Sequence, residues 1–125
     1  LVTVLHVSYL FIPTGFLLIA AGNIWPDYIS SVAGMHAFGV GAIGSMTLSV
    51  MIRATFGHTG QPLKADLKTW LILIMIWISA ISRVAAALYA PGMEMLLEIA
   101  ATTWVLAFAG FSVTFAKLLF RPKGF

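Results

Sequence analysis

The chain contains no cysteine and very few charged residues. Among its 125 residues, only four are Asp or Glu and seven are Lys or Arg, so charged side chains make up 9% of the sequence. The lack of cysteine excludes disulfides, thiolate metal ligands and covalent haem attachment through a CxxCH motif. The sequence also shows no paired carboxylates, no activated nucleophile and no phosphate-binding Gly-rich loop followed by Lys. These absences favour a non-enzymatic role.

Apolar residues dominate what is present. They make up 61% of the sequence, and the mean hydropathy is +1.02. A water-soluble fold of this size could not cover so much apolar surface, so we expect a membrane protein. Its surroundings are then membrane lipid, and we expect no nucleic-acid partner.

Four apolar windows are each about 20 residues long, enough to cross a hydrocarbon core of roughly 30 Å as a helix. They run from about residue 2 to 21, 31 to 52, 67 to 89 and 95 to 119. Because a helix satisfies its own backbone hydrogen bonds in lipid, we expect an all-α polytopic protein with four transmembrane helices in an antiparallel up-down bundle. Residues 1–125 then form one domain. Pro13 cannot donate to the carbonyl of Tyr9, so we expect a bend in the first span.

The charged residues sort to opposite ends of these spans. The basic residues of the central loop and the C-terminal tail fall on one side, namely Arg53, Lys64, Lys68, Lys117, Arg121 and Lys123. The acidic residues Asp27, Glu94 and Glu98 fall toward the other side. The positive-inside rule therefore predicts that both termini and the loop 53–66 face the cytoplasm. Pro62 is predicted to occupy the first turn of the third span.

The second span carries small residues at a strict spacing of four. They are Ala33, Ala37, Gly41, Ser45 and Ser49, with Gly34, Gly39 and Gly44 besides. Small residues at this spacing allow a second helix, or a flat cofactor, to approach the backbone closely. Helix packing is the commoner use, so we expect a helix interface on this face.

Arg83 is the only Lys or Arg in the interior of a span, away from its ends, and two interpretations of it stay open. Counted from the APGM turn, it lies at nearly the level of Glu98, which predicts an ion pair. It also lies near the level of His36, where it could neutralise an anionic group of a cofactor. His36 itself could hydrogen-bond to a neighbour or hold a metal.

The two histidines within the spans are too far apart to share one metal. The level of His6 falls near Thr47 on the antiparallel second span, so His6 and His36 are separated by roughly 16 Å along the membrane normal. We expect His36 to be the better haem ligand, because it lies beside the small residues and at the depth of Arg83. His6 would then serve a second metal site with His58, which is expected in the loop, or only a hydrogen bond.

Several segments resemble the NnrS family of bacterial inner-membrane proteins, which are associated with the response to nitric oxide. The most specific is HAFGVGAIGSMTLSVMIRATFGHTGQPL, from His36 to Leu63. The segment LHVSYLFIPTGFLL and the third span with Arg83 and its LYAPG turn resemble the flanking family segments. The family positions carried over are His6, His36, Arg53, His58 and Arg83. Members of this family are longer, so we expect the chain to be the C-terminal four-helix part of a longer protein.

The resemblance implies binding of haem, which must be non-covalent here, and of copper, together with tolerance of nitric oxide in the bacterial inner membrane. Which histidine binds which metal stays open, as do ligands from other transmembrane segments or from a homo-oligomer. Two other functions also stay open. One is a transporter or channel module in which the Gly-rich helix and Arg83 line a path for a small anion. The other is a purely structural module.

Overall fold

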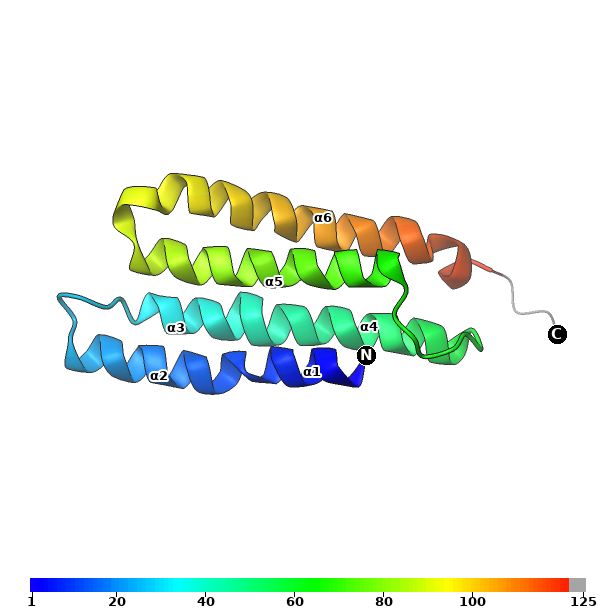
Figure 1. Ribbon diagram of the computed structural model, residues 1–125, viewed down its shortest axis with the longest axis horizontal. Coiled ribbons are helices and arrows are strands. Elements are labelled where there is room, and N and C mark those ends of the chain that lie inside the picture. The colour runs from blue at the N-terminus through cyan, green and yellow to red at the C-terminus, as the bar shows by residue number, and fades with distance from the viewer. Residues whose placement is uncertain (122–125) are drawn as a thin grey trace.

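The structure is a computed structural model that describes residues 1–121, and helices make up almost all of this part (Figure 1). The elements are α1 (Val2–Tyr9), α2 (Phe11–Ile24), α3 (Val32–His36), η1 (Ala37–Gly44), α4 (Ser45–His58), α5 (Leu67–Leu88), η2 (Ala90–Gly92) and α6 (Met93–Leu119). They join into four helical spans that are long and apolar enough to cross a membrane, Val2–Ile24, Val32–His58, Leu67–Leu88 and Ala90–Leu119. The predicted all-α fold with four such helices is confirmed.

Successive spans run antiparallel and lie side by side in the order of the sequence (Figure 1). The first span, α1 and α2, packs chiefly on the second span, which consists of α3, η1 and α4. α5 packs on all three parts of the second span and, most extensively, on α6. The second and third spans are therefore the centre of the bundle.

The first span is interrupted at Leu10, one turn before Pro13. α1 ends at Tyr9, whose carbonyl is the one that the missing N–H of Pro13 leaves without its helical donor. Thr14 returns to the helical pattern by donating both its backbone N–H and its hydroxyl to the carbonyl of Leu10, at 3.2 and 2.7 Å. The interruption lies at the turn where the sequence predicts a disturbance.

The second span contains a π-helical segment, η1, which the sequence analysis did not predict. It covers Ala37–Gly44 and begins directly after His36. All five residues of the spacing-four series, Ala33, Ala37, Gly41, Ser45 and Ser49, are buried. Ser45 and Ser49 donate their hydroxyls to backbone carbonyls one turn earlier in the same span. The small residues thus lie at an interface, as predicted.

The second span also extends further than its apolar window. It remains helical through Arg53 and ends at His58, so the prediction of a loop from residue 53, with His58 in it, is wrong. The physical reason is that a helix needs backbone hydrogen bonds but not apolar side chains, and Arg53 is exposed. The loop begins with Thr59 and turns at Gly60, whose φ of 69° favours glycine.

The third span begins at Leu67 rather than at Pro62, so the predicted place of Pro62 in its first turn is also wrong. Asp66 is the N-cap: its carboxylate accepts hydrogen bonds from the backbone N–H and the hydroxyl of Thr69, at 2.9 and 2.7 Å. These bonds, the one from the Thr69 side chain above all, hold the pKa of Asp66 below its usual value. A side-chain cap such as Asp66 accepts a hydrogen bond from a free N–H of the first helical turn. Proline in the first turn has no N–H and so only avoids leaving one unsatisfied.

The large apolar side chains of the core gather toward one half of the bundle. Its main members are Leu48, Ile52, Phe56, Ile76, Phe111 and Phe115. The rings of Phe56 and Phe115 meet edge to face with their centroids 5.4 Å apart. Many other apolar side chains, such as those of Leu17 and Val113, are exposed on the spans, as expected for a surface that faces lipid.

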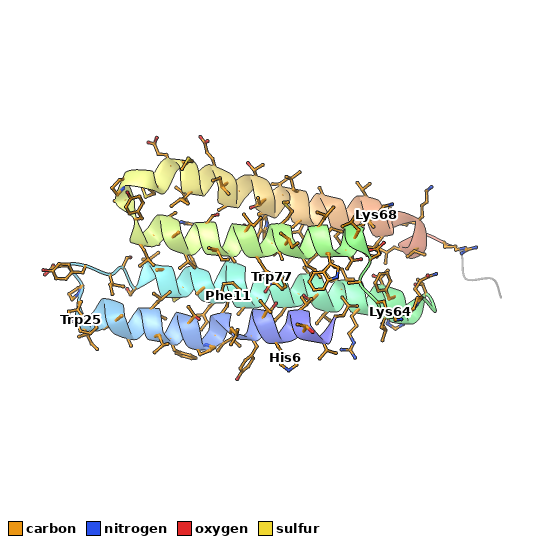
Figure 2. All side chains as sticks on the ribbon, in the orientation of Figure 1. His6, Phe11, Trp25, Lys64, Lys68 and Trp77 are labelled. Carbon is orange, nitrogen blue, oxygen red and sulfur yellow. The ribbon has the colours of Figure 1, made fainter. Side chains whose placement is uncertain are left out.

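The two ends of the bundle carry opposite charges. Lys64 and Lys68 lie at one end and Trp25 at the other (Figure 2). We call the first of these the basic end; it comprises the loop 59–66 and the adjoining helix ends, with Arg53, Lys64, Lys68, Lys117 and Arg121. Asp27 follows α2, and Glu94 and Glu98 lie in the first two turns of α6, at the other end. Lys123, predicted with the basic group, lies outside the described residues.

Candidate functional site

His36 lies where the second span changes from α-helix to π-helix. It is the last residue of α3, its side chain is half-buried, and it is close enough to Arg83 of α5 for the two groups to interact electrostatically. The helices that carry the two residues, α3 and α5, pack on one another, as a common level of His36 and Arg83 requires. π-Helical segments inside α-helices often occur at functional sites.

Arg83 lines a groove of about 310 Å³ between the second span, α5 and α6. Val40, one turn after His36, forms one wall, and Leu97, Ala101 and Trp104 of α6 form another. The groove is mostly apolar, so the guanidinium of Arg83 is its main polar feature. An apolar groove with one fixed cation suits a ligand that is largely apolar and carries one anionic group.

Ser79 and Trp104 are the groove residues that the sequence analysis did not single out. Ser79 donates its hydroxyl to the carbonyl of Ala100 at 2.7 Å, and this bond joins α5 to α6. Because Ser79 is four residues before Arg83, helical spacing places both on one face of α5 and could have identified Ser79. Trp104 belongs to another helix, and no sequence pattern relates it to Arg83.

The ion pair considered between Arg83 and Glu98 is not formed. An ion pair requires the nitrogen and oxygen atoms to lie within 4.0 Å, and among residues 1–121 these two side chains do not meet this distance. Glu98 is exposed on α6, whereas Arg83 is half-buried. Arg83 thus lies in a membrane-spanning helix without Glu98 as an ion-pair partner.

Three glycines of the second span, Gly34, Gly41 and Gly44, are covered by the first span and by α6, whereas Gly39 is exposed. A Cβ atom built on Gly41 would lie 2.4 Å from the ring of Phe11, and one on Gly34 would lie 2.5 Å from the side chain of Ile19. A Cβ on Gly44 would lie 2.7 Å from the ring of Trp104. These distances are shorter than any ordinary contact, so other side chains already occupy this face. It has no room for a flat cofactor.

His6 lies on the outside of α1. Its ring is exposed and points away from the other helices (Figure 2). The Nδ1 atom lies 2.9 Å from the carbonyl oxygen of Val2, so the ring forms a hydrogen bond within its own helix. α1 packs on η1 and α4 but not on α3, so the structure does not bring His6 to His36.

His58 lies at the basic end and lines two grooves there. One groove, of about 480 Å³, also includes Thr55, Phe111 and Arg121, and the other, of about 430 Å³, includes Arg53. Helix α4 extends beyond the N-terminus of α1, so its last residue, His58, does not meet His6 (Figure 1). The structure therefore does not assemble the predicted site of His6 with His58.

The donor set fits haem better than copper. Within residues 1–121, no group of three or more His, Asp or Glu side chains could hold a metal ion. A haem iron needs only one or two axial ligands from the protein, since the macrocycle supplies the others. His36 can supply one axial nitrogen, and Arg83 can pair with a carboxylate of the macrocycle. For copper, the described residues provide single histidines only.

The comparisons with known proteins identify a family. A family model described as NnrS protein matches residues 1–123, almost the whole chain. No curated protein and no solved structure matches the chain. The match covers the segment from His36 to Leu63, on which the sequence resemblance rests.

Proposed function

This chain belongs to the NnrS family, and we propose on that basis that it is a membrane-embedded haem-binding protein of the response to, or tolerance of, nitric oxide. The observation that carries the proposal is that α3, which ends with His36, packs on α5, where Arg83 lines an apolar groove. A half-buried imidazole can ligate a haem iron, and a nearby guanidinium can pair with a propionate. The proposed location is the bacterial inner membrane, with the basic end in the cytoplasm.

In this proposal, His36 would hold the iron and Arg83 would neutralise one propionate. A haem held by His36 would supply an iron that can bind small diatomic molecules such as nitric oxide. The apolar walls of the groove, Val40, Leu97 and Trp104, would exclude water from the ring edge that they contact. Ser79 would fix the spacing of α5 and α6 through its bond to Ala100.

The packing of the second span decides from which side haem could approach His36. Phe11 and Ile19 of the first span already contact Gly41 and Gly34, so that side is filled. On the side of Arg83, by contrast, there is a groove. At about 310 Å³ the groove lies at the lower end of the range for pockets that enclose a small molecule, so it would take an edge of the macrocycle. The remaining surface of the haem would contact lipid, another transmembrane segment or a second copy of the chain.

We include copper binding in the proposal only if other transmembrane segments or a second copy of the chain supply further ligands. His6 and His58 are exposed, and neither has a second histidine beside it in residues 1–121. A copper site at either residue would therefore need donors from further transmembrane segments or from a partner copy.

The test is the visible spectrum of the detergent-solubilised protein and its histidine variants. We expect a Soret band that shifts on reduction, its loss in His36→Ala, and its retention in the matched control His6→Ala. Arg83→Gln should weaken haem retention and leave the helical content unchanged. A folded His36→Ala protein that keeps the wild-type spectrum would refute the assignment of His36.

Arg83 also supports a second candidate function. A cation without the Glu98 partner, in a mostly apolar groove within the membrane, is the feature expected of a path for a small anion. Reconstitution in liposomes separates the two candidates. A colourless protein that moves anions, and that loses this activity in Arg83→Gln, would favour transport over haem binding.

A further inference from the structure

The strongest unassigned feature of the molecule is the pair of grooves that meet at His58. We propose that these grooves bind one anionic phospholipid, with its anionic headgroup at the arginine side chains of the grooves, Arg53 and Arg121, and its acyl chains along the apolar walls. The site is separate from His36, the last residue of α3, and from Arg83, which lies in the last third of α5. The proposal therefore does not depend on haem binding.

The two grooves share two lining residues on α4 and otherwise have different walls. His58 and Ala54, both on α4, line both grooves. The larger groove is walled by Met51, Phe111 and Leu118 and ends at Arg121. The smaller groove is walled by Val50, Gly57 and Leu63 and contains Arg53. Each groove therefore combines an apolar floor with one permanently charged guanidinium.

Small residues on α4 keep the smaller groove open. A Cβ atom built on Gly57 would have nothing within 4 Å, so the space beside it is empty. Ala54, whose side chain is a single methyl group, lines the same groove one turn earlier. A hydrocarbon chain fills a space of this kind without needing any hydrogen bond.

The charge of the basic end favours an anion. Five basic residues and one acidic residue, Asp66, lie there, so the side chains sum to +4. Asp66 already accepts two hydrogen bonds from Thr69. The C-termini of α4 and α6 each contribute about half a negative charge, which leaves the end clearly positive.

The depth of the site favours a lipid over a soluble anion. Arg53 precedes the end of α4 by five residues, which places its Cα about 7.5 Å deeper than that of His58. Val50 and Met51 continue the groove walls toward the lipid-facing surface and are themselves exposed. A phosphate bound at Arg53 would thus lie at the boundary between headgroups and hydrocarbon. Basic pockets between transmembrane helices at this level are typical sites for anionic headgroups.

The test is a lipid titration of the purified full chain in a neutral detergent. We expect phosphatidylglycerol to bind and to raise the melting temperature, and phosphatidylcholine and free inorganic phosphate to do so much less. Arg53→Gln and Arg121→Gln should each weaken phosphatidylglycerol binding about five-fold. The matched control Lys64→Gln removes a charge at the same end but outside both grooves, and should weaken it less than about two-fold.

A second variant tests the groove itself without changing the charge. Gly57→Leu should reduce phosphatidylglycerol binding by filling the smaller groove, and the empty space around Gly57 should let the lipid-free protein fold normally. Equal weakening by Lys64→Gln and Arg53→Gln would overturn the proposal in favour of diffuse surface charge. Stabilisation by inorganic phosphate equal to that by phosphatidylglycerol would overturn the proposal in favour of a soluble anion. Equal binding of phosphatidylcholine and phosphatidylglycerol would also overturn it, because the site would then not select an anionic headgroup.

Discussion

Replacing Gly41 by Ala tests the closest packing in the molecule. The new Cβ atom would lie 2.4 and 2.5 Å from the Cδ1 and Cγ atoms of Phe11 and 2.9 Å from its Cβ. Favourable carbon contacts begin near 3.5 Å, so the Phe11 side chain would have to retreat by about 1 Å. Because the contact includes the Cβ of Phe11, rotation of the ring alone cannot relieve it. Overpacking of this kind typically costs about 1–3 kcal/mol.

Gly39→Ala is the matched control in the same π-helical segment. A Cβ on Gly39 would have nothing within 4 Å. Both substitutions gain the same helix propensity, about 1 kcal/mol, so the difference between the two variants isolates the clash. We expect Gly41→Ala to be less stable than Gly39→Ala by about 1–3 kcal/mol in reversible unfolding in detergent. Equal stability of the two variants would refute the assignment of this face to the interface with the first span.

Three further predictions concern topology, capping and the link between α5 and α6. Because the chain has no cysteine, Asp27→Cys and Gln61→Cys give single labelling sites, and we expect a membrane-impermeant thiol reagent to label them from opposite sides. Removing the N-cap by Asp66→Ala should lower the free energy of unfolding by about 1 kcal/mol. The pKa of Asp66 is lowered in the folded state, so the stabilisation by Asp66 should be fully present above the usual pKa of 3.8 and be lost as the pH falls through the folded pKa. In an acid titration of the free energy of unfolding, Asp66→Asn should remove this part of the pH dependence. Ser79→Ala should cost about 0.6 kcal/mol by deleting its 2.7 Å bond to a carbonyl of α6.

Hydropathy predicted the existence of the four spans but not their ends. The windows ended where apolar residues gave way to charged or turn-forming residues, as at Arg53. In the structure, the ends are set by backbone hydrogen bonds, by the cap at Asp66 and by the positive φ of Gly60. These are local features that averaging over an apolar window removes. The result is a second span that is helical for six residues beyond the predicted end.

The site was only partly predictable for a related reason. Counting residues from a turn gives depth along a helix, and this predicted one level for His36 and Arg83, which lie on helices that pack on one another. Depth does not give direction around the helix axis. Glu98 has a suitable depth but is exposed on α6 and does not reach Arg83, and His6 points outward. The partners Phe11 and Trp104 depend on how separate helices pack, which no spacing within one helix reveals.

The π-helical segment explains how residues at a strict spacing of four can form one interface. In an α-helix with 3.6 residues per turn, a step of four residues overshoots a full turn by about 40°, so a long series of such steps would wind around the helix. In a π-helix, closed by i→i+5 bonds, four residues fall short of a full turn. The series begins in α3, crosses η1 at Ala37 and Gly41 and ends in α4, so the two deviations oppose one another. All five members are consequently buried, and the first span can approach Gly41 closely enough for Phe11 to fill the place of a side chain. Since η1 begins directly after His36, the segment that aligns this interface also adjoins the residue proposed to hold the haem.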